Sequence, residues 1–425
     1  MMARFVRVKS SVVTGAVVAI ALGHLPVAPQ QVPIRNLGPP SATSDTQAGS
    51  IAGLKQLPNG RVLVNDPISR RLVVLDSNLR TFAVTADSSA RSGRAYPASR
   101  VGALYSYRGD SSLLIDWDSR AFLVIGTDGR VGRVMAHVRT DDLINVNYPW
   151  AITAGGDPMG RFVYRDRPTQ RFDSTTSKLG PVRPFSRIAD TLALLRADFD
   201  HRTIDTVGLV AIPHTEAAVY TTGASGKQEG AIRVNPLLIA PDDWAVLSDG
   251  TVAIVRAQDY HVDWVSMDGK TVSTARMPVD WRRLSDADKQ ARVDSVKAII
   301  DSLATTTRPY GWTTRTRFSI DGPHADTIVP TVRFAPLDEM PDYVPPFRHG
   351  TVRADADNHI WILPTASFSA RDGLLYDVVN RQGRLFMRVQ LPAGRDIAGF
   401  GPGGVVYLVT TMPKTRYVLE RTSIH

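Results

Sequence analysis

The chain contains no cysteine and very little glutamate. None of its 425 residues is Cys, and only four of the 41 acidic residues are Glu. A chain without thiols forms no disulfides, no cysteine-ligated zinc or iron–sulfur site and no thiol nucleophile. Glu favours helix interiors whereas Asp favours turns, so the scarcity of Glu argues against a mainly helical protein.

Long apolar runs are also lacking. The most apolar stretch, residues 12–22, is about half of the roughly 20 residues that a spanning helix needs. Arg4, Arg7 and Lys9 precede it, and the small residues Ala21 and Gly23 end it. This pattern predicts an export signal over residues 1–28, with an uncleaved anchor as the alternative. We therefore expect a periplasmic or extracellular protein without a membrane span in its mature chain.

The charge is moderately positive and spread out. With 50 basic against 41 acidic residues, the net charge is +9. The arginines form no long basic run, whereas nucleic-acid-binding proteins concentrate positive charge on one element. We therefore predict no nucleic-acid partner.

A series of turn dipeptides recurs along the chain. Each one follows a short apolar stretch and precedes a stronger β-rich run, as a hairpin does. A second turn lies downstream of each turn in this first series, except after the last one. The first series comprises Asn59-Gly60, Gly109-Asp110, Asp157 to Gly160, Asp249-Gly250, Asp357-Asn358 and Gly403-Gly404.

This double series predicts six units of four antiparallel strands. Such units, repeated around an axis, form a β-propeller, which leaves only short protected edges. The sixth unit has room for only three strands. The segment 31–37 is β-compatible, so we expect the N-terminal region to supply the missing strand. Residues 29–50 are then a closing strand and linker, and residues 51–425 an all-β, six-bladed propeller.

The segments GLKQLPNGRVLVNDPISRRLVVLDSNL and AVLSDGTVAIVRAQDYHVDWVSMDGK resemble blades of bacterial six-bladed propellers of the NHL and TolB-like groups. The resemblance implies the same ring fold for most of residues 50–425. It implies little about activity, because these propellers host unrelated functions.

Two insertions interrupt the repeat. Residues 213–241 form a long connection between blades three and four. Between blades four and five, residues 284–304 predict a helix, because Ser285 and Asp288 fit a capping box and apolar residues recur at helical spacing. In this pattern Lys289 faces away from the apolar stripe. The helix either packs on one rim of the ring or serves as a lid or docking surface.

Polar residues follow the second strand of several blades, where the loops of a propeller line its axial funnel. Alternating Asp and Arg from different blades suit a polar or charged ligand. The alternative is that these side chains satisfy turn backbone groups. The candidate ligand-binding residues are Asp66, Asp116, Asp118, Arg165, Arg256, Asp259 and Tyr260.

No catalytic motif or metal motif stands out. The histidines show no paired zinc-ligand spacing, and Asp355 to Asn358 resembles part of a calcium loop but lacks its Glu. The calcium ligand set that lactonase propellers imply, a Glu with Asn and Asp, is not met either. We therefore predict no catalytic residue, metal or other cofactor.

These observations favour a non-catalytic binding or scaffold module, monomeric, that contacts an envelope protein or the outer face of a membrane complex. Two alternatives stay open. One is a lactonase-like or other hydrolase that uses the axial funnel. The other is a carbohydrate or peptide sensor, in which Trp117 and Trp312 stack on the ligand.

Overall fold

The computed structural model describes most of the chain beyond its first 31 residues. The predicted export signal therefore lies outside the described residues. The described residues are 32–87, 96, 101–116, 119, 121–139, 154–166, 191–212, 219–222, 228–234, 241–305, 313–319, 322–329, 331–369, 372–412 and 416–424.

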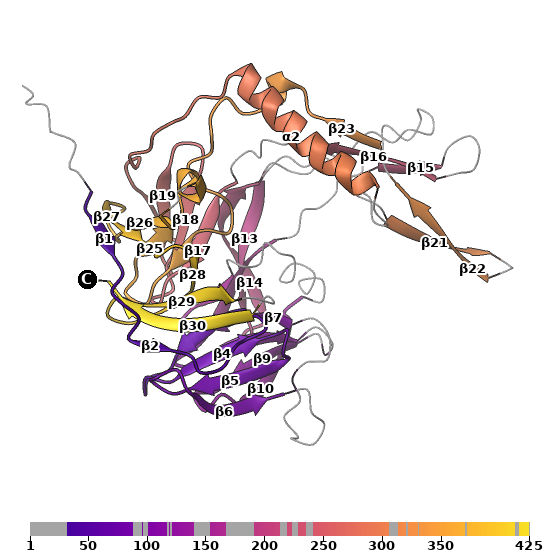
Figure 1. Cartoon of the computed structure of the whole chain (residues 1–425). Helices are drawn as coiled ribbons and strands as arrows, with labels where there is room; N and C mark the ends of the chain where they lie inside the picture. Colours follow the sequence, from indigo (N-terminus) through magenta and orange to yellow (C-terminus); the bar gives the residue numbers. More distant parts are fainter. Residues whose placement is uncertain are drawn as a thin grey trace, which may run out of the picture. The chain divides into compact units, whose positions relative to one another are not determined.

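Six four-stranded antiparallel units form the propeller, as predicted (Figure 1). Blade one consists of β3 (Leu54–Gln56), β4 (Val62–Asp66), β5 (Arg71–Leu75) and β6 (Thr81–Ala86), and blade two of β7 (Val101–Ser106), β8 (Ser112–Asp116), β9 (Ala121–Ile125) and β10 (Val131–Ala136). Blade three consists of β11 (Gly155–Gly156), β12 (Arg161–Arg165), β13 (Thr191–Asp198) and β14 (Thr203–Ala211), and blade four of β17 (Asp243–Val246), β18 (Val252–Arg256), β19 (His261–Val265) and β20 (Thr271–Ser273). Blade five consists of β24 (Arg353–Ala354), β25 (Ile360–Ile362), β26 (Leu375–Val379) and β27 (Leu385–Gln390), and blade six of β28 (Arg395–Gly401), β29 (Val405–Met412), β30 (Arg416–Ser423) and β2 (Ala42–Thr43).

The predicted turns connect the first and second strands of the blades. Gly60 and Gly250 have φ angles of +77° and +83°, and Asn358 has φ +64°. A glycine or asparagine tolerates this left-handed conformation, which most residues avoid. The turn residues therefore set the strand boundaries locally.

Six hydrophobic clusters hold the ring together, one between each pair of neighbouring blades. The strands in the middle of each blade are buried on both faces. In blade one, Leu63 packs toward blade two, whereas Val62 and Val64 pack toward blade six. Alternate side chains of one strand thus serve two different cores, which explains why these strands are apolar throughout.

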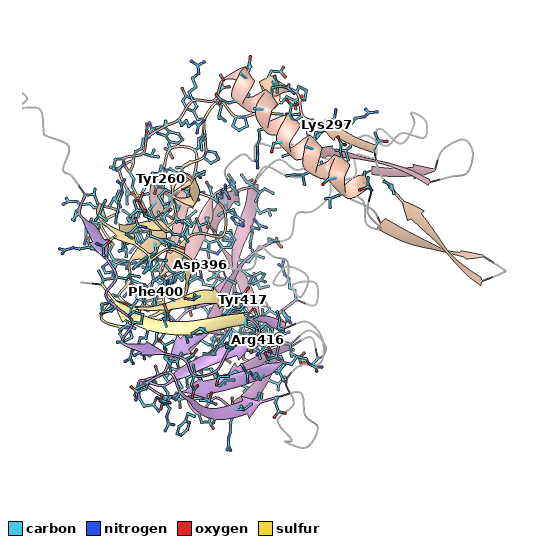
Figure 2. The ribbon with its side chains drawn as sticks, viewed as in Figure 1. Tyr260, Lys297, Asp396, Phe400, Arg416 and Tyr417 are labelled. Carbon is cyan, nitrogen blue, oxygen red and sulfur yellow. The ribbon has the colours of Figure 1, made fainter. Side chains whose placement is uncertain are left out.

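The ring closes through the N-terminal region, as predicted, but with a different segment. Ala42 and Thr43 pair antiparallel with β30 and complete blade six. Tyr417, labelled at the start of β30 in Figure 2, exchanges backbone hydrogen bonds with Ala48. Most of the segment expected to close the blade forms β1 (Ile34–Asn36), which pairs parallel with β27 of blade five, whereas Leu37 at its end bridges antiparallel to Ile424, directly after β30. The N-terminal region therefore joins two blades.

The two insertions form one substructure, which the repeat pattern did not predict. The first contributes β15 (Val219–Thr222) and β16 (Gln228–Val234). The second contributes the hairpin of β21 (Thr313–Ser319) and β22 (Gly322–Ile328), followed by β23 (Thr331–Phe334) and the 3₁₀ helix η3 (Leu337–Glu339). Strand β16 pairs parallel with β23, so residues about 100 positions apart share a sheet.

The predicted helix is α2 (Asp286–Ala304), and Ser285 and Asp288 form its capping box. Val293 and Ile300 are buried as expected, whereas Ile299 is exposed. Lys289, expected on the outer face, is buried instead, because its Nζ donates to Leu337 O, Met340 O and Asp342 Oδ1 at 2.8–3.3 Å. None of the helices in the described ranges combines the length and apolarity that a membrane span requires.

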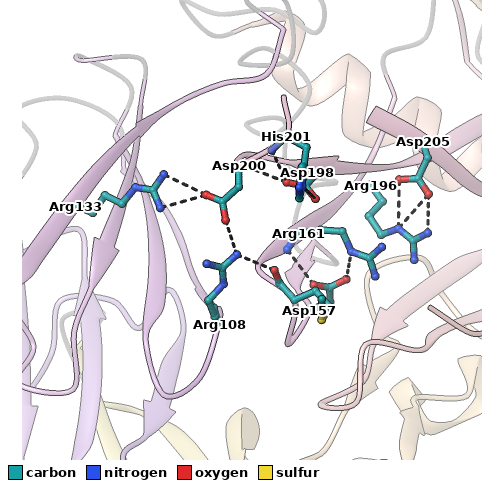
Figure 3. A network of polar contacts seen from close by, with 10 residues as sticks. Arg108, Arg133, Asp157, Arg161, Arg196, Asp198, Asp200, His201 and Asp205 are labelled. Atoms are coloured by element: carbon teal, nitrogen blue, oxygen red, sulfur yellow. Dashed lines mark hydrogen bonds and ion pairs between the residues drawn. The ribbon is translucent and has the colours of Figure 1, made fainter. Parts of the chain in front are cut away.

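Polar side chains also connect neighbouring blades. Asp200, between the third and fourth strands of blade three, accepts hydrogen bonds from Arg108 at 2.6 Å and from Arg133 at 3.3 Å, both from blade two (Figure 3). Nearby, Asp157 is buried and accepts from Arg161 Nε at 2.7 Å. The Asp200 contacts are exposed, whereas the Asp157 pair is enclosed.

Candidate active site

Four side chains from three blades meet at one end of the ring, and we call them the Asp243 cluster: Asp243, His349, Arg165 and Trp244. Asp243 begins β17, His349 precedes β24, and Arg165 ends β12. The first and second strands of a blade run antiparallel. The start of a first strand and the end of a second strand therefore lie at the same end of the ring, the end where the axial site was predicted.

Asp243 is fully buried and held by backbone donors. Its Oδ2 accepts from the N–H groups of Thr351 and Val352, both at 3.0 Å, and its Oδ1 accepts from the N–H of Trp244 at 3.0 Å. Burial disfavours the charged carboxylate and raises the pKa of Asp243 to about 7, although these hydrogen bonds lower it. The carboxyl group therefore titrates near neutral pH.

His349 lies beside this carboxyl group. Its Nδ1 is 3.6 Å from Asp243 Oδ1, which is longer than a hydrogen bond. Burial, followed by the charge of Arg165, lowers the pKa of His349 to about 4. The imidazole is therefore neutral at pH 7. Both ring nitrogens are covered and make no hydrogen bond of ordinary geometry with the residues that the structure describes.

Arg165 brings a positive charge to the same place. Burial lowers the pKa of Arg165 to about 10, and the charge of Asp243 partly opposes this shift. The guanidinium therefore stays charged at pH 7. Its Cζ lies 6.0 Å from the ring of the buried Trp244, and the ring centroids of Trp244 and His349 are 6.1 Å apart.

The Asp243 cluster has the features of a proton-transfer site. It combines a neutral imidazole, a carboxyl group that titrates near neutrality and a fixed cation. Perturbed pKa values produced by burial and specific charge partners are concentrated at functional sites. Buried polar atoms without hydrogen bonds cost about 1–3 kcal/mol each, so their retention at His349 calls for an explanation. Within the described ranges, no group of three His, Asp or Glu side chains is arranged to hold a metal ion.

The carboxylate of Asp66 is fully engaged in hydrogen bonds to its own turn and to a neighbouring segment. Its carboxylate accepts hydrogen bonds from the N–H groups of Gly49, Ser50 and Ser69 at 3.0–3.1 Å and from Arg71 Nε at 3.2 Å. These bonds fix the loop after β4 and the segment that enters blade one. Turn chemistry, the alternative left open by the sequence, accounts for this residue.

The other predicted residues are separated from one another. Asp116 accepts from Ser119 Oγ at 2.5 Å, and Asp118 lies outside the described residues, as do Trp117 and Trp312. Tyr260, labelled in Figure 2, is buried in the core between blades four and five. Its hydroxyl donates to Asp377 at 3.1 Å. A φ of +51° directs the chain through a tight turn there, and the side chain does not line a funnel.

Arg256 and Asp259 line a cleft of about 980 Å³. One wall is β14, the outermost strand of blade three, and another is the insertion around Trp281 and Tyr343. We call it the insertion cleft. Of the predicted residues, Arg165 alone belongs to the Asp243 cluster. A ligand-binding role for the predicted set stays a prediction.

Sequence reasoning missed Asp243, His349 and Trp244. The available signal was the pair Asp242-Asp243 directly before a β-rich run, at the connection between two blades. Such connections lie at the same end of the ring as the loops that were searched. His349 carries no motif, and only the fold brings it to Asp243.

Comparisons with known proteins agree with a propeller and leave the family unassigned. No protein-family model matches the chain, and no curated protein matches it. Virginiamycin B lyase from Staphylococcus aureus is 10% identical, with a TM-score of 0.36 over 90% of this chain and 97% of its own. A gluconolactonase from Xanthomonas campestris is 9% identical, with a TM-score of 0.37 over 92% and 98%. A protein from Bacteroides vulgatus is 8% identical, with a TM-score of 0.43 over 90% and 96%.

The expectation of a non-catalytic scaffold is corrected by the Asp243 cluster. Two of the similar structures are enzymes by name, a lyase and a gluconolactonase. The scaffold hypothesis depended on the lack of a catalytic constellation, and the Asp243 cluster removes that premise. At TM-scores below 0.5 the similarity assigns no activity, so the case for an enzyme depends on the side chains of this chain. The resemblance to NHL and TolB-like propellers stays a prediction.

Proposed function

We propose that the protein is a hydrolase of lactones or other carboxylic esters, with its active site at the Asp243 cluster. One observation carries the proposal: the neutral imidazole of His349, whose covered ring nitrogens have no hydrogen bond of ordinary geometry among the residues that the structure describes, lies beside a buried carboxyl group and a charged guanidinium. This is the hydrolase alternative that the sequence left open.

In the proposed reaction His349 is the general base. Asp243 faces Nδ1 and positions the ring, so Nε2 accepts a proton from water. The water oxygen attacks the ester carbonyl carbon, and the bond from that carbon to the alcohol oxygen breaks. The proton on His349 then passes to the leaving alkoxide. The side chain is 22% exposed while both ring nitrogens are covered, so the scheme requires the imidazole to move until Nε2 reaches the water.

Arg165 has a separate role in this scheme. Attack on a carbonyl places negative charge on its oxygen, and a fixed cation in a poorly hydrated site stabilises that charge. Arg165 is positively charged at pH 7, largely buried, and its Cζ lies 6.0 Å from the ring of Trp244. The guanidinium therefore needs little rearrangement as the charge develops.

The test is a hydrolysis assay on γ- and δ-lactones and on p-nitrophenyl esters. We expect turnover by the purified protein, and His349→Ala is expected to lower kcat/KM by about 10²–10⁴-fold. Arg165→Met is expected to lower kcat more than it raises KM. His201→Ala is the matched control, because His201 is an exposed turn residue of blade three.

Two results would reject the proposal. One is the absence of turnover on every substrate by protein that is folded by circular dichroism. The other is turnover that His349→Ala leaves at the level of His201→Ala. Either result would mean that the Asp243 cluster has a structural role and no catalytic one.

We also propose that the protein acts outside the cytoplasm, on the basis of the signal pattern in residues 1–28. Cell fractionation followed by N-terminal sequencing of the mature protein tests this. An intact Met1 on protein from the cytoplasmic fraction would refute it.

A further inference from the structure

The insertion cleft has one wall that belongs to the insertions and is held firmly. The segment around residue 282 runs antiparallel to the segment around residue 343, because Leu284 N donates to Asp342 O at 2.8 Å and Val344 N donates to Arg282 O at 2.9 Å. Helix α2 fixes the same segment through Lys289, whose Nζ is 2.8 Å from Asp342 Oδ1. The wall is therefore held in place by hydrogen bonds within the protein.

Two aromatic rings from this wall line the cleft. Trp281 is 39% exposed and Tyr343 is 48% exposed, although both are large side chains with apolar faces. Their centroids are 6.2 Å apart at an interplanar angle of 84°. Pro341, Pro345 and Pro346 adjoin them and stiffen the backbone. The cleft thus offers exposed aromatic faces on a rigid support.

The opposite wall, from blade four, offers oriented polar groups. Asp259 is 2.6 Å from His261 Nδ1 through Oδ1 and 3.5 Å from Arg276 Nε through Oδ2. Arg256 Nη1 donates to Asp242 Oδ2 at 2.7 Å. Asp242 is buried and also accepts from the N–H groups of Ala211 and Ala257, so it orients Arg256, whereas Asp259 retains further lone pairs for a ligand. The polar groups are therefore oriented by contacts within the protein.

The charges of the cleft nearly cancel. Asp242, Asp259 and Asp342 contribute carboxylates, and Arg256 and Arg276 contribute guanidinium groups. Lys289 adds a positive charge directly behind Asp342. A strongly charged ligand gains little from such a lining. An uncharged ligand with many hydroxyl groups can donate to the carboxylates and accept from the guanidinium groups.

From this juxtaposition we infer that the insertion cleft is a binding site for a neutral oligosaccharide. The C–H faces of the sugar rings stack on Trp281 and Tyr343, and the hydroxyl groups bond to Asp259 and its charged neighbours. The volume of about 980 Å³ accommodates more than one sugar ring. The inference is independent of the proposed hydrolysis, because the cleft and the Asp243 cluster share no side chain.

A proline-rich peptide is the competing ligand, since such peptides dock on aromatic grooves. The polar groups that blade four contributes to the cleft favour an oligosaccharide over a proline-rich peptide. A polyproline helix presents few hydrogen-bond donors, and would bury Asp259 against an apolar surface without partners for its remaining lone pairs.

The experiment measures binding of neutral gluco-, xylo- and chito-oligosaccharides and of a polyproline peptide to the full chain, by calorimetry and tryptophan fluorescence. We expect at least one oligosaccharide series to bind, with affinity rising with chain length. Trp281→Ala and Asp259→Asn are each expected to weaken binding by about tenfold or more. Trp281→Phe is expected to retain most of the affinity, because it preserves a stacking surface.

Phe82→Ala is the matched control, because Phe82 is 55% exposed on blade one, outside the cleft. It should leave the affinity unchanged, as should His349→Ala, which separates this site from the proposed active site. The inference is overturned if no oligosaccharide binds, if the polyproline peptide binds instead, or if Trp281→Ala and Asp259→Asn bind as the Phe82→Ala control does.

Discussion

The ammonium group of Lys289 lies 2.8 Å from Oδ1 of Asp342, and this contact joins helix α2 to a wall of the insertion cleft. Lys289 also donates to two backbone carbonyl groups, Leu337 O and Met340 O. A buried lysine is tolerated when its charge is paired and its donors are used. The Lys289 side chain therefore donates hydrogen bonds to η3 and to the residues after it, and these bonds anchor helix α2 to that segment.

Replacement of this lysine is expected to loosen the helix. Lys289→Met removes the donor to Met340 O and one of two donors to Leu337 O, which also accepts from Met340 N, at a cost of about 1–3 kcal/mol to the local stability of the insertion. Hydrogen exchange in α2 should accelerate while exchange in the blades stays unchanged. Lys297→Met is the control, because Lys297 is exposed on the same helix (Figure 2). Equal exchange rates in the two variants would contradict the role of Lys289.

The stability of the protein is expected to depend on pH through two opposing groups. The pKa of Asp243 is about 7 in the folded protein and ordinarily 3.8, so the folded state holds a proton that the unfolded state loses between about pH 4 and 7. This contribution to stability falls as the pH rises. The pKa of His349 is about 4 and ordinarily 6.5, so its contribution rises with pH between these values.

Single substitutions should separate the two contributions. Relative to the wild type, Asp243→Asn should gain stability as the pH rises from about 4 to 7, and His349→Gln should lose it from about 4 to 6.5. Urea denaturation midpoints across this range measure both differences. Differences that are flat with pH, or of the same sign, would show that these groups do not carry the assigned pKa shifts.

The carboxylates in Figure 3 should differ in their effect on stability according to their burial. Asp157→Asn removes the charge from an enclosed pair with Arg161 and is expected to destabilise the protein by about 2–4 kcal/mol. Asp200→Asn affects exposed contacts with two arginines and should change stability little. Chemical denaturation of both variants tests this, and a larger loss for Asp200→Asn would reverse the assignment.

Truncations test how the ring closes. A chain that begins at Gly38 lacks β1 but keeps β2, and we expect only a modest decrease in its melting temperature. A chain that begins at Ile51 lacks both, which leaves β30 as an open edge and uncovers the core around Tyr407 and Leu419. We expect this chain to unfold at a much lower temperature or to aggregate. Similar melting curves for the two truncations would mean that β2 does not close the ring.

The blades could be predicted because their signals are local. A dipeptide such as Asn59-Gly60 sets a hairpin by its own backbone preference, and Ser285 caps a helix three residues away. Six repetitions of one local pattern were enough to predict the ring. The position of the closing strand was less well determined, because both 34–36 and 42–43 are short and β-compatible.

The candidate site depends on contacts that no local pattern encodes. Asp243 and His349 are 106 positions apart, and only the packing of blade four against blade five brings them together. The pairing of β16 with β23 is equally remote. Tyr260 was expected to face a ligand because it lies in the loop after the second strand of blade four, but the turn directs its ring into the core. In each of these cases the fold topology determines where the residue lies, and the residue type alone does not predict that position.

Blade six combines strands from both ends of the described chain, and this has a consequence for biosynthesis. Strand β2 emerges from the ribosome early but has no partner until β30 has been made. The first five blades can form in chain order before blade six is complete. Until then, the apolar surfaces of blades one and five that pack against blade six stay exposed. Ring assembly is therefore a late event, and a chaperone that shields those two surfaces would act on the nascent protein at this stage.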